Sequence, residues 1–391
     1  MVPSSASTGP PGRVLVTDGE FKHTLGIVRQ LARRGHEVHL IARTSAAPAV
    51  HSRAVRRWHR APASGAPDYD ARLLEVARSL APVSLLPVGN AAVAAADRLR
   101  GRFPSEVRVA LPSCESLAVA NDKERTAELA RQLGLRTPRE RRIASLEEAR
   151  AAWREFGAPL VLKSAREEGV KTVRYARDEA GVAPAFEAAR MASGGAVLAQ
   201  EYIAGEGYGW SALYWNGVLQ RSLMHRRVRE WPPSGGTSAC AESVPEAPAL
   251  AQAGAALLDA LRWHGVAMVE FKGALAPGAL ALIEINAKFW GSHDVALAAG
   301  VDFPGDLVAL LEGRALAAQA PPKAVRFAWP FGGDLWHGIF RPASLPAVLR
   351  DALSPAVAHS WRLDDLPPLF FEIAQWARSA PGAWREQRMT R

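Results

Sequence analysis

The stretch VAMVEFKGALAPGALALIEIN, residues 266–286, is the most informative part of the chain, because two apolar segments flank a turn and carry acidic residues at matching positions. The turn lies around Pro277, so the two segments are predicted to form an antiparallel hairpin. Glu270 and Glu284 each stand seven residues from Pro277. They should therefore lie opposite each other on one face of the hairpin, and Asn286, two residues further on, points to the same face.

Two carboxylates directly opposite each other destabilise a sheet and are costly to bury without a cation. The oxygens of Glu270, Glu284 and Asn286 form a set of hard ligands that suits Mg²⁺. The other interpretation is an exposed polar face of the hairpin. We favour the metal site because both strands are otherwise apolar and because Lys288 continues the same face.

Toward the N-terminus, residues 13–112 alternate short apolar strands with helices, which is typical of an open parallel α/β domain. Strands are predicted at 14–16, 37–42, 83–88 and 107–111, and helices near 25–31, near 69–80 and after Asn90. The turn after the first strand contains Gly19 but no GxGxxG motif, which disfavours the usual dinucleotide site. Residues 1–12 show no such pattern, and we expect them to be disordered.

Composition sets broad limits. Of the 391 residues, 48% are hydrophobic, which is enough to fill a large core in two or three domains. The two cysteines, Cys114 and Cys240, are too far apart in sequence for a zinc motif and too few for a disulfide scaffold. No signal peptide or apolar run of membrane-spanning length is evident, so a soluble, cytoplasmic protein is expected.

The net charge of +9 leaves an anionic partner open. Much of the excess lies in HSRAVRRWHR, residues 51–60. A nucleic-acid patch is one interpretation of this run. A solvated basic face is favoured, because only Trp58 interrupts the basic residues and no nucleic-acid motif accompanies them.

The middle of the chain changes in texture. Helices are predicted after Asn121 and Asp122 and at 146–156 and 250–263, strands at 159–164, 170–176 and 197–201, and a hairpin turn at Asn216–Gly217. Two lysines stand in unusual places. Lys163 ends an apolar strand, and Lys123 begins a helix, where the helix dipole disfavours a cation. Either could only extend to solvent, but both are useful if a polyphosphate binds nearby.

Several motifs follow one another in an order and spacing that resemble the ATP-grasp superfamily of carboxylate-amine ligases. They are Lys123 in NDK, Lys163 in LVLK, the segment QEYIAGEGYG (200–209), Glu270, and EIN with Lys288 and FWGS. The resemblance covers roughly residues 10–314. It implies a mixed α/β and α+β fold with an N-terminal open parallel α/β domain at 13–112 and an ATP-grasp domain at 113–314. The latter would contain a small lid at about 146–200 and a larger antiparallel core. Residues 315–391 form a C-terminal extension without an assigned role.

The same resemblance implies roles for single residues. Lys123 and Lys163 would contact the phosphates of ATP, Glu201 and Ile203 would lie at the adenine, and Glu206 would bind the ribose. Glu270, Glu284 and Asn286 would hold two Mg²⁺ ions, or Mn²⁺ in their place. The lid loop SAREEGVKTV (164–173), with Gly169 and the cations Arg166 and Lys171, would fold over the triphosphate.

The stretch HRRVREWPPSGGTSA, residues 225–239, is our candidate substrate loop. It offers His225, Arg227, Gly235 and Gly236 to a carboxylate or an acyl phosphate. The alternative is a plain surface loop rich in Pro and Gly. Arg226 and Lys288 are the candidate catalytic residues, stabilising the oxyanion of the tetrahedral intermediate.

The resemblance thus predicts an ADP-forming ligase that joins a small carboxylate to a small amine through an acyl phosphate. Two alternatives stay open: a carboxylation like that of biotin carboxylase, and a basic regulatory module that only binds a nucleotide. Neither nucleic acid nor membrane is expected as a partner, and a homodimer is compatible with the sequence.

Overall fold

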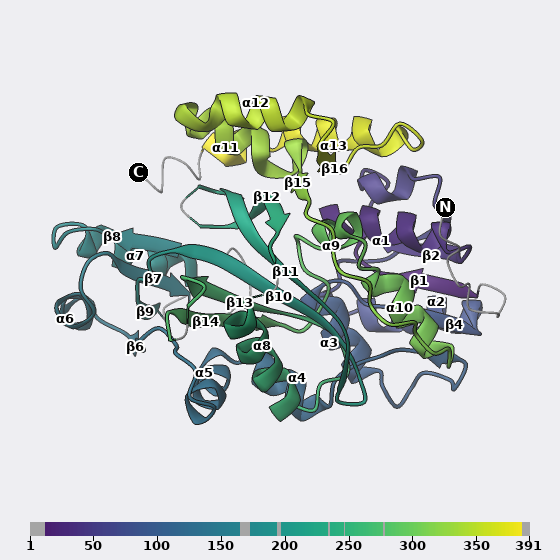
Figure 1. The fold of residues 1–391 in the computed structure, drawn as a ribbon, viewed down its shortest axis with the longest axis horizontal. Coiled ribbons are helices and arrows are strands. Elements are labelled where there is room, and N and C mark those ends of the chain that lie inside the picture. The colour runs from purple at the N-terminus through teal and green to yellow at the C-terminus, as the bar shows by residue number, and fades with distance from the viewer. Residues whose placement is uncertain are drawn as a thin grey trace.

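The computed structural model describes most of the chain. The described residues are 12–164, 173–193, 197–233, 235–245, 247–276 and 278–384. Residues 1–11 of the expected disordered N-terminus, the lid-loop residues Arg166, Gly169 and Lys171, and the turn residue Pro277 lie outside them. The described chain folds around three β-sheets, of five, seven and four strands (Figure 1).

The N-terminal sheet is parallel throughout, in the order β3-β2-β1-β4-β5. Its strands are β1 (Arg13–Val16), β2 (Glu37–Ala42), β3 (Val55–Arg60), β4 (Val83–Leu86) and β5 (Val107–Arg108). The helical segments between them are α1 (Lys22–Arg33), η1 (Pro48–His51), α2 (Tyr69–Leu80) and α3 (Asn90–Arg98). The predicted open parallel domain is confirmed, although the last strand spans only two residues.

The basic run at 51–60 contains a strand that the sequence did not indicate. Within it, β3 pairs in parallel with β2 and forms the edge of the sheet. Arg56, Arg57 and Arg60 are exposed on this strand. Positive side chains along an edge strand discourage pairing with another chain, so the run has a structural explanation that needs no nucleic acid.

The lid is a four-stranded antiparallel sheet in the order β6-β9-β7-β8, with two helices. Its elements are β6 (Glu140–Ile143), α6 (Leu146–Phe156), β7 (Leu160–Ser164), β8 (Val173–Ala176), α7 (Val182–Ser193) and β9 (Val197–Glu201). Helix α6 begins with a capping box, in which Ser145 and Glu148 each bond the other's backbone N–H. Helices α4 (Cys114–Ala120) and α5 (Lys123–Gln132) lead into the lid.

The core sheet has seven strands in the order β14-β13-β10-β11-β12-β15-β16. Its central strands are β10 (Glu206–Trp215), β11 (Val218–Trp231), β12 (Thr237–Ser243), β13 (Gly265–Gly273) and β14 (Leu280–Asn286), and helices α8 (Pro248–Ala260), α9 (Asp294–Ala299) and α10 (Phe303–Leu311) accompany them. All neighbouring pairs from β14 to β15 are antiparallel. Asn216 adopts a positive φ at the turn joining β10 to β11, as the predicted hairpin requires.

The C-terminal region completes this sheet. It consists of β15 (Arg326–Ala328), η2 (Pro330–Asp334), α11 (Leu335–Phe340), η3 (Pro342–Ser344), α12 (Leu345–Leu353), β16 (Val357–His359) and α13 (Pro367–Arg378). Strand β15 pairs with β12, and β16 adds in parallel at the edge. The helices lie over this end of the sheet, at the top of Figure 1. Residues 315–384 therefore contribute two strands to the core sheet and do not form a separate appendage.

One hydrophobic cluster joins the N-terminal domain to the core. Val16 and Leu25 from the first domain pack with Leu223, Met268 and Trp329 of the core and C-terminal regions. Both cysteines are free. Among the described residues, no helix is long and apolar enough to cross a membrane.

Candidate active site

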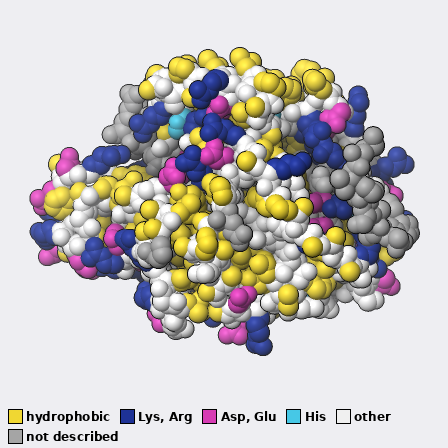
Figure 2. All heavy atoms as spheres, viewed as in Figure 1, with side chains coloured by type: hydrophobic (Ala, Val, Ile, Leu, Met, Phe, Trp, Pro, Cys, Tyr) yellow, Lys and Arg dark blue, Asp and Glu magenta, His cyan; other side chains and the backbone are white. Residues whose placement is uncertain are grey.

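A cleft of about 720 Å³ opens between the lid sheet and the core sheet. The lid contributes Lys163 and Gln200, and the core contributes Glu270, Glu284 and Asn286. Figure 2 shows Lys and Arg side chains, with some acidic ones among them, gathered between the C-terminal helices and the rest of the molecule on one face. The cleft brings together residues that lie far apart in the sequence.

The register of the β13–β14 hairpin confirms the predicted pairing of its acidic residues. Glu270 is the partner of Glu284, and Asn286 is the partner of Met268. A register shift after Glu270 pairs Phe271 with Leu282 and leaves Ile283 as an extra residue. Asn286 donates an amide hydrogen bond to Glu284 Oε1 at 3.1 Å. Their role in binding metal stays a prediction.

A cation already lies against the acidic pair, and it is Arg227 of β11. Its Nη2 lies 2.5 Å from Glu270 Oε2, and its Nη1 donates to Glu230 Oε1 at 3.0 Å and to the carbonyl of Gly236 at 3.1 Å. Burial alone would lower the pKa of Arg227, but the Glu270 and Glu230 carboxylates outweigh it and raise that pKa. Arg227 is therefore a permanent positive charge at the floor of the cleft.

The two predicted phosphate lysines both line the cleft. Lys123 is the first residue of α5, where Asp122 accepts hydrogen bonds from the N–H groups of Glu124 and Arg125. Lys163 on β7 donates from Nζ to Gln200 Oε1 at 3.0 Å. The structure brings both lysines to the same cleft as the acidic pair, as the sequence predicted.

The residues predicted at the adenine and ribose also line the cleft. Glu201 ends β9 and accepts from the backbone N–H of Arg139 at 3.1 Å. Ile203 is 5% exposed and presents an apolar surface. Glu206 begins β10, accepts from the hydroxyl of Tyr208 at 2.7 Å and pairs with Arg226 at 2.5 Å.

The prediction for Arg226 as an oxyanion donor in the cleft is not supported by its position. Arg226 pairs with Glu206 and Glu242 at 2.5 and 2.6 Å, and it is not among the residues that line the cleft. Alternation along β11 turns neighbouring side chains to opposite faces, so Arg227 faces the acidic pair and Arg226 does not. Lys288, the other predicted catalytic residue, does line the cleft.

The prediction of a long loop at 225–239 is wrong. Strand β11 continues to Trp231 and β12 begins at Thr237, so the turn between them spans 232–236, with residue 234 outside the described part. Gly235 and Gly236 line the cleft from this turn. Charged residues such as those in HRRVREW give no apolar alternation, which is why the sequence pattern did not indicate a strand.

His225 lies under the cleft and does not face it. It is 1% exposed, and its Nε2 shares a hydrogen bond of 2.8 Å with the hydroxyl of Ser292, which lines the cleft. Burial, with Arg227 nearby, lowers the pKa of His225 to about 3. The ring is neutral at physiological pH, so direct contact with a substrate carboxylate is not its role in this structure.

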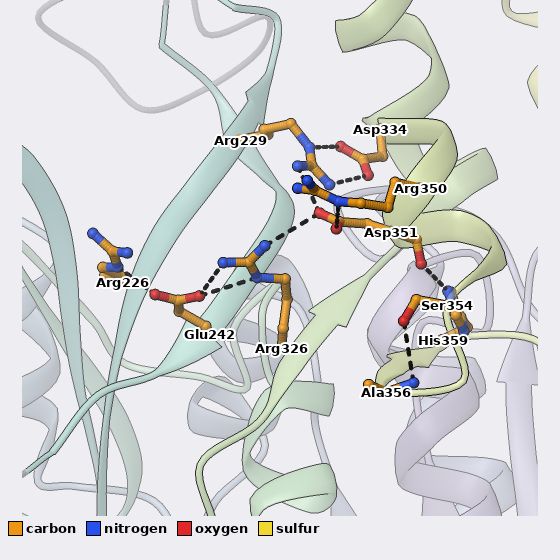
Figure 3. Close-up of polar contacts among 10 residues, drawn as sticks. All are labelled: Arg226, Arg229, Glu242, Arg326, Asp334, Arg350, Asp351, Ser354, Ala356 and His359. Carbon is orange, nitrogen blue, oxygen red and sulfur yellow. Dashed lines mark hydrogen bonds and ion pairs between the residues drawn. The ribbon is translucent and has the colours of Figure 1, made fainter. Parts of the chain in front are cut away.

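The C-terminal region supplies side chains that sequence reasoning missed. Arg229 lines the cleft wall and is held by Asp334, at 2.6 and 2.8 Å, and by Asp351 at 2.8 Å (Figure 3). His337 also lines the cleft, and its Nδ1 shares a 2.8 Å hydrogen bond with the carbonyl of Glu230. No local motif marks these residues, because their importance depends on β15 joining the core sheet.

The donor set fits a divalent cation. Glu270 is only 9% exposed, and its pairing in register with Glu284 sets two carboxylates side by side at the cleft. Such a pair repels itself unless positive charge lies close to it, and Arg227 supplies one such charge, beside Glu270. All the candidate ligand atoms are oxygens, which suits Mg²⁺ or Mn²⁺. Lys123 and Lys163 at the same cleft suit the phosphates that such an ion accompanies.

Comparison with known proteins supports the fold. No family model and no curated protein matches the chain. Among solved structures, a biotin carboxylase complex with β,γ-ATP from Campylobacter jejuni has a TM-score of 0.64 at 16% identity, covering 80% of this chain and 74% of the other.

Two further structures match at similar length. N5-carboxyaminoimidazole ribonucleotide synthetase from Thermus thermophilus has a TM-score of 0.60 at 19% identity and covers 80% of this chain and 82% of its own. L-amino acid ligase from Bacillus licheniformis has a TM-score of 0.56 at 17% identity, with 78% and 75% covered. The chain has the ATP-grasp fold, as the sequence predicted. At these identities the likeness shows the fold and not the activity.

Proposed function

We propose that the protein is an ATP-dependent ligase that joins a small carboxylate to a small amine through an acyl phosphate, releasing ADP and phosphate. One observation carries the proposal. Glu270 and Glu284 are paired in register on β13 and β14, and they line the same cleft as Lys123 and Lys163 in an ATP-grasp fold. That arrangement suits a triphosphate with its divalent cations.

In the first step, an oxygen of the substrate carboxylate attacks the γ-phosphorus of ATP. The bond from that phosphorus to the β,γ-bridging oxygen breaks, and ADP leaves. Lys123 and Lys163 hold the phosphates, Glu201 and Ile203 contact the adenine, and Glu206 contacts the ribose. Mg²⁺ held by Glu270, Glu284 and Asn286 would neutralise charge on the transferred phosphoryl group.

In the second step, the amine nitrogen attacks the acyl carbon. The C–N bond forms, the C–O bond to phosphate breaks, and the amine proton passes to phosphate or water. The tetrahedral intermediate carries an oxyanion. Arg227 and Lys288, which both line the cleft, would stabilise it, and Arg227 replaces Arg226 in this proposal.

We keep the proposed domains, at 13–112 and 113–314 with a C-terminal extension, and change only the role given to the extension. We include the extension in the proposed catalytic unit, because β15 and β16 extend the core sheet and His337 lines the cleft. We propose small molecules as the only substrates, a cytoplasmic location, and a homodimer as a form to test.

The test is ADP and phosphate release over a panel of carboxylates crossed with amines, with the product mass measured. Glu284→Gln should reduce ADP formation by at least about a hundredfold, because it removes a charged metal ligand. Glu106→Gln, an exposed glutamate of the N-terminal domain, is the matched control and should retain activity. Undiminished turnover in Glu284→Gln, or release of AMP and pyrophosphate, contradicts the proposal.

The same assay separates the two alternatives. Bicarbonate-stimulated ADP release that needs no amine would indicate the carboxylation chemistry. Nucleotide binding without ADP formation under any acceptor, together with steeply salt-dependent binding to duplex DNA, would indicate the regulatory module.

A further inference from the structure

A second cavity of about 270 Å³ lies between the N-terminal domain and the C-terminal region. Its walls come from α1, α9 and the strands β15 and β16, which lie close together in Figure 1. It shares no lining residue with the cleft. Lys22 borders it and donates from Nζ to the carbonyl of Ser238, a residue that lines the cleft.

One face of α1 forms the long wall of this cavity. The lining residues of α1 follow helical spacing over three turns: Lys22, Leu25, Gly26, Arg29, Gln30 and Arg33. Eleven residues of helix rise about 16 Å. The cavity is therefore elongated along the helix and suits an extended ligand.

The inner end of the cavity carries the carboxylate of Asp294, with the cation Lys22 near it but beyond ion-pair distance. Asp294 is 5% exposed, and its Oδ2 accepts a hydrogen bond from Trp329 Nε1 at 2.8 Å. Its Oδ1 lies so close to the backbone of Gly26 that a Cβ built there would overlap it. Within the described part of the chain, Oδ1 has no hydrogen-bond donor, and no cation lies within 4.0 Å of Asp294. A buried carboxylate oxygen without a donor suits a ligand ammonium group.

The outer end of the cavity is basic. Arg33 is exposed, and within the described residues it makes no ion pair within 4.0 Å. Burial, and then the nearby Arg362, lower the pKa of Arg33, and Asp364 only partly offsets them. Arg362 pairs with Asp364 at 3.0 Å, but both side chains are largely exposed, so that pair is weak. Crowded cations of this kind suit a carboxylate.

The sides of the cavity between these two ends are mostly apolar. The apolar lining comes from Leu25, Leu297, Ala298, Val325, Phe327 and Ala358, with Gln30, His359 and Ser360 as the polar residues beside them. Arg29 also lines the cavity, but its guanidinium is occupied by Asp365 and the carbonyl of Ser360. The cavity thus presents a negative end, an apolar middle and a positive end to one ligand.

We propose that this cavity binds a short zwitterion with small apolar side chains, such as a dipeptide, with its ammonium group at Asp294 and its carboxylate at Arg33 and Arg362. Gly26 and Arg33 are separated by about 10 Å along α1, and the arginine side chain leans back toward the N-terminus. Two extended residues span about 7 Å, which fits the remaining gap, whereas the adjacent charges of a single α-amino acid do not. The site goes beyond the proposed ligase activity and does not depend on it.

The test is isothermal titration calorimetry of the full chain with L-alanyl-L-leucine in the absence of ATP. The dipeptide should bind, and both N-acetyl-L-alanyl-L-leucine and L-alanyl-L-leucine amide should bind at least about tenfold more weakly. Because no nucleotide is present, failure of this experiment leaves the ligase proposal untouched.

Two variants assign the ends of the ligand. Asp294→Asn should weaken binding of the dipeptide and abolish the preference of the protein for the dipeptide over its N-acetyl form. Arg33→Gln should abolish the preference for the dipeptide over its amide. Arg56→Gln, an exposed arginine of β3, is the control and should bind like the wild type. Arg33 is on the surface, so its variant will fold even where Asp294→Asn is less stable. No heat at millimolar dipeptide, equal binding of the blocked forms, or unchanged binding by both variants would overturn the proposal.

Discussion

Two arginines that lie two residues apart on β11 have different roles, one at the acidic pair of the cleft and one in the packing of the C-terminal region. Arg227 and Arg229 both line the cleft, and their side chains are 18% and 6% exposed. Arg227 pairs with Glu270, one of the two carboxylates predicted to bind metal. Arg229 is held by Asp334 and Asp351 from the C-terminal region. The residue type is the same and both side chains are largely buried, so the partners decide the role.

The difference lies in where those partners are. Both carboxylates that pair with Arg227, Glu270 and Glu230, themselves line the cleft. Asp334, which pairs with Arg229 through two bonds, is fully buried, and Figure 3 shows Asp351 completing the set. Carboxylates at a cleft can exchange a partner for a ligand ion, whereas a buried and satisfied cluster fixes the architecture.

Among the variants that test this comparison, Arg227→Met is expected to lose the most activity. Loss of the guanidinium at the cleft should lower the rate of ADP formation by on the order of a hundredfold, because it removes a preorganised donor. Arg227→Lys keeps the charge and should recover part of the loss. The measurement is kcat with saturating ATP. Activity in Arg227→Met near that of the wild type would remove the distinction between the two arginines.

Asp334→Asn tests the other side of the comparison. Asp334 is fully buried, and removing its charge leaves Arg229 with one of its two partners, so the free energy of unfolding should fall by about 3 kcal/mol. ADP formation per folded molecule should change little. Denaturant unfolding and activity measured on the same preparation check both parts. A stable variant that lost its activity would show that Arg229 acts in catalysis.

Asp294→Asn gives a pH-dependent prediction for the second cavity. Burial raises the pKa of Asp294 to about 6, although Trp329 and the cations Lys22 and Arg29 partly offset it. The folded state therefore binds this proton more tightly than the unfolded state, and stability is lost as pH rises from about 4 to about 6. Two pKa units correspond to about 3 kcal/mol.

Asparagine has no such titration. The melting temperature of Asp294→Asn relative to the wild type should therefore rise between about pH 4 and pH 6 and stay level above pH 7. Thermal unfolding across this range measures the difference. Asp68→Asn, at an exposed aspartate, is the control. A difference independent of pH would show that folding leaves the pKa of Asp294 unshifted.

Arg226→Gln should change the protein least. Arg226 pairs with Glu206 and Glu242 while partly exposed, and such pairs contribute up to about 1 kcal/mol. The rate of ADP formation should stay within about threefold of the wild type, with any change in the KM for ATP arising through Glu206. A hundredfold loss of kcat would return the oxyanion role to Arg226 and contradict the assignment to Arg227.

Local pattern along the chain was enough to predict several elements. The parallel N-terminal sheet follows from alternating strands and helices, and the pairing of Glu270 with Glu284 follows from their equal distance from a turn. Lys123 and Lys163 could be placed because a helix start and a strand end are visible in the sequence. These features need only neighbours along the chain.

The charged strands, in contrast, could not be predicted without the tertiary structure. HRRVREW and VRRWHR have too few apolar residues to show a strand period, and they become β11 and β3 because neighbouring strands pair with them. Likewise, Asp334 and Asp351 reach Arg229 only because β15 joins β12 from a distant part of the chain. Ion pairs between distant segments leave no periodic pattern in a sequence. Packing therefore decides that Arg227 faces the acidic pair and that Arg229 holds the C-terminal region.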